Sequence, residues 1–229
     1  MSIPLIWIYW AISLTIATAI SGYIVRYQIK IGFAVLLSFY IIYLAASQIT
    51  ATRIAIFNLG FAEFTAPAAV FLYPFTAQAI DMINEVYGRE KTHLAIGIAF
   101  ITQVLLVLFI LLVKKLPPAP FFKYEEAWQD IFQMGLRITF ASWVSFLICQ
   151  NVDAYVFSTL KKRFESKIIL RSVTSDILDL TLDSIIFIIV AFYGRMPLSM
   201  LIIGQIVTKN LIGIIDTPWF LWYKRIITR

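Results

Sequence analysis

The chain has 229 residues, of which 61% are hydrophobic and only 14% are charged, and its mean hydropathy is +0.86. Soluble domains contain about 45–50% apolar and about 25% charged residues, so this composition excludes an ordinary soluble protein and indicates a membrane protein. The net charge of +6 would suggest nucleic-acid binding in a soluble protein. Here the basic residues concentrate in short segments between apolar stretches, so membrane topology explains them better and we expect no nucleic-acid partner.

Seven stretches are long and apolar enough to cross a bilayer as helices, since about 20 such residues are needed. In chain order they are residues 3–25, 31–52, 65–87, 92–113, 136–160, 170–193 and 198–223. The first lacks the basic start of a signal peptide and its apolar run is long, so we expect it to be retained as a helix. The sequence therefore predicts an all-α integral membrane protein, a bundle of seven transmembrane helices.

The charges between these stretches predict how the chain crosses the membrane. With seven spans, most basic residues fall on one side, after the first, third and fifth spans and at the C-terminus: Arg26, Lys30, Arg89, Lys91, Lys161, Lys162, Arg163, Lys167, Arg171, Lys224, Arg225 and Arg229. The opposite side carries Glu63, Arg195 and the pair Lys114 and Lys115, and this pair fits less well. Because short basic loops stay in the cytoplasm, we expect a multi-pass cell-membrane protein with its N-terminus outside and its C-terminus in the cytoplasm.

One connection, residues 114–135, is longer than the others and reads KKLPPAPFFKYEEAWQDIFQMG. Pro117, Pro118 and Pro120 exclude a helix at its start. Further along, acidic residues alternate with aromatic and aliphatic ones at the spacing of a short amphipathic helix. Such a helix is expected at the outer membrane interface, where it serves as an anchor or as a lid over an outward-facing cavity.

Eight polar or charged side chains lie inside the apolar stretches, where a charge costs about 2.5–3.5 kcal/mol on insertion scales. They are Asp81, Asn84, Glu85, Gln150, Asp153, Asp183, Lys209 and Asp216. Residues kept at such a cost are candidates for function, although Glu85 lies near enough to a span end to be hydrated.

The spacing of these residues places several on shared helical faces. Asp81 and Glu85 are four residues apart, and Gln150 and Asp153 are three apart. Asp176, Asp179 and Asp183 form an acidic stripe in the span 170–193. Asp183 and Lys209 both fall near the middle of a span, so we expect them to form a buried ion pair. A purely structural pair is the alternative.

Enzyme signatures are absent from the sequence, which contains no HExxH, GxSxG or P-loop motif. The single histidine, His93, begins a span and cannot build a metal site with other histidines. We therefore expect a protein that is not an enzyme and needs no metal or cofactor.

Several segments resemble the queuosine precursor transporter family. They are FTAPAAVFLYPFTAQAIDMINEVYGRE, ASWVSFLICQNVDAYVFSTLKK, LDSIIFIIVAFYG and the stretch from Lys209 to the Asp-Thr-Pro at Asp216. The resemblance covers about residues 50–223. It implies that residues 31–229 form a six-helix core, similar to the S components of energy-coupling-factor vitamin transporters. Residues 1–30 would then be an additional N-terminal helix and loop.

The same resemblance implies uptake of 7-deazaguanine bases, namely the cyano and aminomethyl precursors of queuosine or queuine. It assigns a role to matching positions in this chain: Asp81, Asn84, Glu85, Gln150, Asp153, Arg171, Asp183, Lys209 and Asp216. Asp176, Asp179 and Leu180 depart from the family pattern. We expect Asp179 to suit the positive charge of an aminomethyl group.

The chemistry of these residues fits such a base. A deazaguanine presents a ring N–H and an exocyclic amine beside a carbonyl group, so a carboxylate can accept from the two donors while a lysine or an amide donates to the carbonyl. Our first expectation is a proton-coupled secondary transporter working in the lipid bilayer on a nucleobase-like substrate. The alternatives are an S-component-like binding subunit of an ATP-driven transporter, an intramembrane enzyme and a ligand sensor. Whether the chain forms a homo-oligomer or needs an energising partner stays open.

Overall fold

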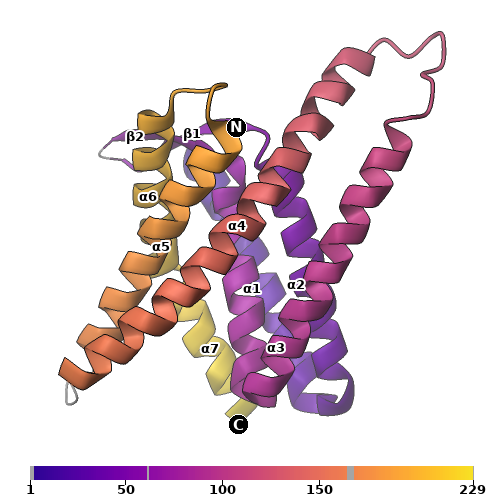
Figure 1. Ribbon diagram of the computed structural model, residues 1–229. Coiled ribbons are helices and arrows are strands. Elements are labelled where there is room, and N and C mark those ends of the chain that lie inside the picture. Colours follow the sequence, from indigo (N-terminus) through magenta and orange to yellow (C-terminus); the bar gives the residue numbers. More distant parts are fainter. Residues whose placement is uncertain (1–2, 61, 164–167, 229) are drawn as a thin grey trace.

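The structure, a computed structural model, describes the backbone of residues 3–60, 62–163 and 168–228 and most of their side chains. The side chains outside this description are those of residues 3–4, 89, 147, 150–163, 168–177, 179 and 228. Helices dominate the described chain and pack as an elongated bundle (Figure 1). The elements are α1 (Ile3–Tyr27), α2 (Ile29–Thr50), β1 (Ile54–Asn58), β2 (Glu63–Pro67), the 3-10 helix η1 (Ala68–Leu72), α3 (Tyr73–Val113), α4 (Glu125–Arg163), α5 (Ile168–Phe192), α6 (Leu198–Ile215) and α7 (Thr217–Thr228).

The two termini lie at opposite ends of this bundle (Figure 1). The hairpin of β1 and β2 and the connections 114–124 and 193–197 lie toward the N-terminal end of the bundle. The α1–α2 connection and the end of α4 lie toward the C-terminal end, as does the middle of α3. Most of the segments that are rich in lysine and arginine therefore share the C-terminal end, whereas Lys114 and Lys115 lie toward the N-terminal end. Which end faces the cytoplasm stays a prediction.

Four helical stretches in the described part of the chain are long and apolar enough to cross a membrane. They are Leu5–Tyr27, Ile29–Thr50, Glu90–Val113 and Leu198–Ile227, and Leu180–Phe192 is a shorter apolar helix. The predicted helical membrane protein is thus confirmed in its class. The number of seven transmembrane helices stays a prediction, because the spans 136–160 and 170–193 lie partly among residues whose side chains are not described.

The hairpin of β1 and β2 was not predicted from the sequence. Its strands are antiparallel and pair Ile54 with Pro67 at one end and Asn58 with Glu63 at the other. The turn is set by Asn58, whose Oδ1 accepts a hydrogen bond of 2.9 Å from the backbone N–H of Gly60, where φ is +88°. The expected span 65–87 was wrong at its start, because short apolar runs do not distinguish strand from helix. Its continuous helix begins only at Tyr73.

The hairpin lies directly on α6. Gly204 of α6 has no side chain at the point of contact, and a Cβ there would collide with the backbone carbonyl group of Thr65 in β2. Ala66 and Pro67 are consequently buried between the hairpin and the bundle. A glycine at this point lets a strand and a helix approach each other backbone to backbone.

Two helices change direction where the sequence predicted spans or loops. Gly88 interrupts α3 with φ of +78°, so the predicted spans 65–87 and 92–113 meet at a sharp break instead of a loop. The predicted span 198–223 is divided at Asp216 into α6 and α7. Pro218 contributes to this second break, because it has no N–H to donate to the carbonyl group four residues before it and its ring crowds that carbonyl.

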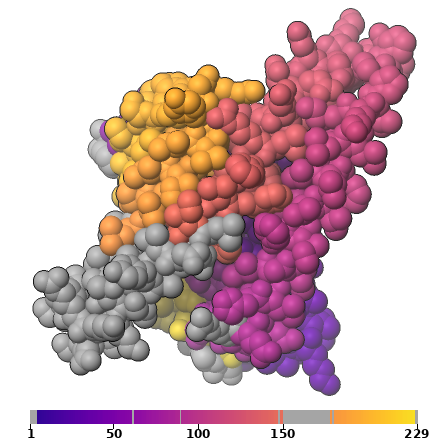
Figure 2. Space-filling view, viewed as in Figure 1, coloured from indigo at the N-terminus to yellow at the C-terminus, as the bar shows by residue number. Residues whose placement is uncertain are grey.

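The expected short amphipathic helix within residues 114–135 is not a separate element. Residues 114–124 form a loop, and Glu125 begins the 39-residue helix α4 without interruption. No proline follows Pro120 in this region, so nothing ends the helix before the predicted span at 136. The ends of α3 and α4 nearest this loop project from the rest of the molecule (Figure 1 and Figure 2).

An apolar cluster joins α4, α5 and α6 toward the N-terminal end of the bundle. Its fully buried members are Ala51, Ile138, Ala141, Ile188, Ala191, Phe192 and Leu201. Arg137 of α4 reinforces it, since Nε donates to the carbonyl oxygen of Val190 at 2.9 Å and Nη2 donates to that of Tyr193 at 2.7 Å. These bonds satisfy carbonyl groups that the end of α5 leaves unpaired. The cluster holds together α5 and α6, which carry Asp183 and Lys209, and α4, which carries Ser145.

Candidate functional site

An ion pair between Lys209 of α6 and Asp183 of α5 forms the centre of the candidate site. Lys209 Nζ donates to Asp183 Oδ2, and the two side chains are 11% and 26% exposed. The predicted ion pair is therefore confirmed. Each charge compensates the other, which a low-dielectric interior requires.

Two further side chains complete this centre, and the sequence did not reveal them. Ser145 of α4 donates to Asp183 Oδ1 at 2.6 Å and lies 3.1 Å from the carbonyl oxygen of the same residue. The ring of Tyr73, at the start of α3, lies 4.5 Å from Lys209 Nζ as a cation–π contact. The ion pair thus gathers side chains from α3, α4, α5 and α6. A serine or a tyrosine in an apolar span is too common to be noticed from sequence alone.

The buried face of α6 carries two more polar groups near Lys209. Gln205 is 5% exposed and Thr208 is fully buried. Neither the Gln205 Oε1 atom nor the Thr208 Oγ1 atom has a hydrogen-bond partner. The sequence analysis missed both residues, although their spacing of four and one residues from Lys209 was a usable signal.

A second polar centre surrounds the break between α6 and α7. Asp216 is 7% exposed, and its carbonyl oxygen accepts a hydrogen bond of 3.1 Å from Gln78 Nε2. Gln78 Oε1 in turn accepts from Thr18 Oγ1 at 3.2 Å, which connects α1, α3 and the break. The carboxylate of Asp81, on α3, interacts repulsively with that of Asp216. These two predicted site residues therefore lie within electrostatic range of each other.

Glu85 and Asn84 have described contacts elsewhere, toward the C-terminal end. Glu85 Oε1 lies 3.0 Å from Lys224 Nζ of α7, and both side chains are more than a third exposed. Asn84 Oδ1 accepts a bond of 3.4 Å from Thr92 Oγ1 across the break at Gly88. An exposed ion pair contributes at most about 1 kcal/mol. These contacts indicate residues that hold α3 and α7 in place at this end.

The remaining predicted site residues, Gln150, Asp153 and Asp179, have side chains outside the described part of the structure. Their backbone places Gln150 and Asp153 on α4, the helix of Ser145, and Asp179 on α5, one turn before Asp183. Their roles stay predictions, as does the expected preference of Asp179 for an aminomethyl group.

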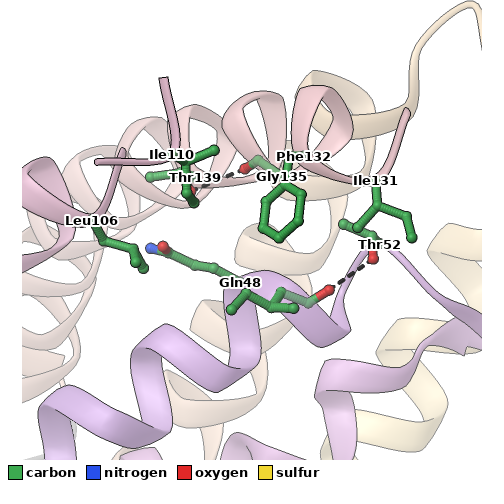
Figure 3. A pocket seen from close by; sticks show the side chains of 9 residues that line it. Gln48, Thr52, Leu106, Ile110, Ile131, Phe132, Gly135 and Thr139 are labelled. Atoms are coloured by element: carbon green, nitrogen blue, oxygen red, sulfur yellow. Dashed lines mark hydrogen bonds between the residues drawn. The ribbon is translucent and has the colours of Figure 1, made fainter. Parts of the chain in front are cut away.

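Two of the hollows among the described residues can be defined, and neither includes Asp183 or Lys209. The first lies between α2, α3 and α4 and has a volume of about 10 Å³, enough for about one water molecule. Figure 3 shows Gln48 of α2 extending into it toward Leu106 of α3. The second is an open groove of about 440 Å³ along α6 and α7, lined by residues that include Thr217, Trp222 and Arg225. From the sequence we also expect a cavity near mid-membrane, walled by the spans 65–87, 136–160, 170–193 and 198–223, and this cavity stays a prediction.

No group of three histidine, cysteine, aspartate or glutamate side chains within the described residues is placed to hold a metal ion. The polar groups of the site are instead a cation, a carboxylate, hydroxyls and amides. Such a set can bind a ligand by hydrogen bonds and charge.

Comparison with known proteins agrees with this character. Residues 67–223 match the model of a family described as "Putative vitamin uptake transporter". A Bacillus subtilis (strain 168) protein named "Probable queuosine precursor transporter" is 27% identical over 168 residues, which cover 71% of this chain and 73% of that protein. No solved structure matches the chain. Because the family match covers more than half of the chain and includes the ion pair, the chain belongs to this vitamin uptake transporter family.

Proposed function

We propose that the protein imports 7-deazaguanine precursors of queuosine into the cytoplasm as a proton-coupled secondary transporter. The observation that carries this proposal is the ion pair of Asp183 and Lys209 where α3, α4, α5 and α6 meet. A largely buried pair is costly to keep for stability alone, because apolar residues of similar size often replace it without loss. The name of the Bacillus subtilis relative supports the class of substrate.

The groups around the ion pair match the edge of a deazaguanine. The Asp183 carboxylate, which already accepts from Ser145 and Lys209, has lone pairs left for the ring N–H and the exocyclic amine. Lys209 carries three N–H donors and can give one to the neighbouring carbonyl group of the base. The ring of Tyr73 offers an aromatic face beside them. Each polar group on this edge of the base then has a partner.

For the coupling proton, the acidic pair of Asp81 and Asp216 is the best candidate in the described structure. Asp183 is already compensated by Lys209, whereas Asp81 and Asp216 repel each other. A proton held by the pair removes this repulsion. Asp216 lies at the break between α6 and α7. The proton would therefore bind and leave at the point where the backbone changes direction.

The test is uptake of labelled 7-deazaguanine by proteoliposomes that contain the purified chain alone. We expect accumulation when the outside is more acidic than the inside, and loss of accumulation when a protonophore removes the gradient. Asp216→Asn should abolish the dependence on the gradient, whereas Asp130→Asn, at an exposed position on α4, should leave it unchanged.

Two results would contradict the proposal. Tight binding without transport would indicate a substrate-binding subunit that needs an ATP-driven partner. Absence of both binding and transport would exclude 7-deazaguanines as substrates.

A further inference from the structure

The amide oxygen of Gln205 is enclosed in the bundle without a hydrogen-bond partner. The residue is 5% exposed, and Oε1 is buried and unpaired. An unpaired buried acceptor costs about 1–3 kcal/mol, so groups of this kind usually have a ligand, a water or an ion as partner. The hydroxyl of Thr208, three residues along the same helix, is unpaired as well. Two such oxygens within four residues of Lys209 mark a place where hydrogen-bonding partners are missing, and the amide oxygen of Gln205 needs a donor.

The position of Gln205 follows from its neighbours on α6. Leu201, four residues before it, packs in the apolar cluster with Ile188 and Phe192 of α5. Lys209, four residues after it, bonds Asp183 of the same helix α5. Residues four apart lie on one face of a helix, so Gln205 faces α5 between these two contacts. Its Cα is about 6 Å from that of Lys209 along the helix axis.

The hydrogen-bond donors of a deazaguanine indicate which group of the base the Gln205 amide oxygen can bind. The exocyclic amine has two N–H groups, and a carboxylate that binds the ring N–H takes only one of them. In a buried site, the second amine N–H needs an acceptor of its own. The carbonyl group, the ring N–H and the amine follow one another along one edge of the base. A base held by Lys209 at its carbonyl and by Asp183 at its ring N–H therefore needs an acceptor beyond Asp183.

We infer that Gln205 is a specificity-determining residue whose Oε1 accepts the second N–H of the exocyclic amine. It thereby selects bases that carry this amine over bases that lack it. This inference rests on the proposed function and assigns one contact within the same site. A base without the amine would leave Gln205 Oε1 buried and unpaired, and sites built to bond a substrate N–H reject such analogues strongly.

The experiment measures competition in the uptake assay. Unlabelled 7-deazaguanine and 7-deazahypoxanthine, which lacks the amine, compete with labelled 7-deazaguanine. We expect the wild-type protein to prefer the amine-bearing base by about tenfold or more, the value of one hydrogen bond in a buried site. Gln205→Met keeps the side-chain length without the acceptor and should lower this ratio to about twofold or less. Gln205→Glu retains an acceptor and should keep the preference.

A matched control is Gln103→Met on α3. Gln103 is 3% exposed and its Oε1 is likewise unpaired, but it lies on another helix and has no described contact with the ion pair. The Gln103→Met variant should prefer 7-deazaguanine over 7-deazahypoxanthine by the same ratio as the wild type. If Gln205→Met transports 7-deazaguanine with an unchanged ratio, Oε1 bonds a water or another group and the inference is wrong. Failure of the wild type to transport either base would instead refute the proposed function, so the two failures are distinguishable.

If Gln205→Met does not fold, Gln205→Glu and Gln205→Asn decide the question. The shorter amide of asparagine should reduce the preference, and glutamate should keep it. Equal ratios in these two variants and the wild type would overturn the inference.

Discussion

At the level of single residues, the proposed function depends on the ion pair of Asp183 and Lys209. A pair that only stabilises the fold and a pair that binds substrate have the same contacts in the empty protein. They differ in what happens when both charges are removed together. Ser145 adds to this argument, because its bond to Asp183 Oδ1 orients the carboxylate from a third helix.

The first prediction concerns the two charges together. Asp183→Asn or Lys209→Met alone leaves one largely buried charge uncompensated and should destabilise the protein by up to about 3–5 kcal/mol. The double variant should recover most of this stability, because neither charge is left alone. The double variant should nevertheless take up no 7-deazaguanine, because both charges proposed to bind the base are gone. Thermal unfolding in detergent and proteoliposome uptake measure the two effects, and normal uptake by the double variant would show that the pair is structural only.

The second prediction concerns Ser145. Ser145→Ala removes a hydrogen bond to a charged group, which is worth about 1.5–3 kcal/mol, and should raise the Kd for 7-deazaguanine about tenfold or more. Ser184→Ala is the matched control, because Ser184 is also fully buried but donates to the carbonyl oxygen of Leu180 in its own helix. Binding measured by calorimetry should be unchanged in this control. Equal effects of the two substitutions would contradict an orienting role for Ser145.

At the scale of elements, two helix breaks and one hairpin shape the site. Gly88 reverses the chain within α3, and Pro218 ends α6 next to Asp216. The hairpin of β1 and β2 packs against α6 at Gly204, one residue from Gln205. The position of α6, and with it that of Lys209, therefore depends on a contact between a strand and a helix.

The third prediction tests this contact. Gly204→Ala places a Cβ against the backbone of Thr65, which cannot move as a flexible side chain would. The hairpin and α6 must separate, and we expect a loss of about 1–3 kcal/mol, typical of overpacking. Gly97→Ala is the control, because a Cβ there meets nothing within 4 Å. In a helix it should instead stabilise by up to about 1 kcal/mol. Equal melting temperatures of the two variants would contradict the close approach of β2 and α6.

At the level of the whole molecule, the two ends of the helical bundle differ, and this difference bears on the orientation in the membrane. The hairpin and the loop 114–124 lie toward the N-terminal end, and most of the segments rich in lysine and arginine lie toward the C-terminal end (Figure 1). A bundle with this asymmetry has one preferred orientation in the membrane, since basic loops are retained in the cytoplasm. The substrate would then enter from the end that carries the hairpin.

The fourth prediction is this orientation. In a Cys149→Ser background, a cysteine introduced by Glu63→Cys should react with a membrane-impermeant maleimide added to intact cells. A cysteine introduced by Lys91→Cys should react only after the membrane is permeabilised. Both positions are exposed in the structure, so access depends on the side of the membrane. The reverse pattern would place the N-terminus in the cytoplasm.

The amino-acid sequence by itself determined the class of the protein and its central ion pair. Apolar stretches of spanning length have few alternatives to a membrane helix, and single charges such as Asp183 and Lys209 must find each other in an apolar interior. The resemblance of the sequence to queuosine precursor transporters also indicated the family to which the chain belongs.

Only the tertiary structure decided which uncharged residues join that pair. Ser145 and Tyr73 are ordinary residues of apolar helices. Their contacts with the two charges depend on how α4 packs on α5 and how α3 packs on α6. The hairpin was likewise beyond the sequence, because a short apolar run suits a strand as well as a helix. In this protein the strand β2 pairs with β1, and Gly204 leaves room for its backbone on α6. Such contacts between distant segments depend on packing, which local sequence patterns do not encode.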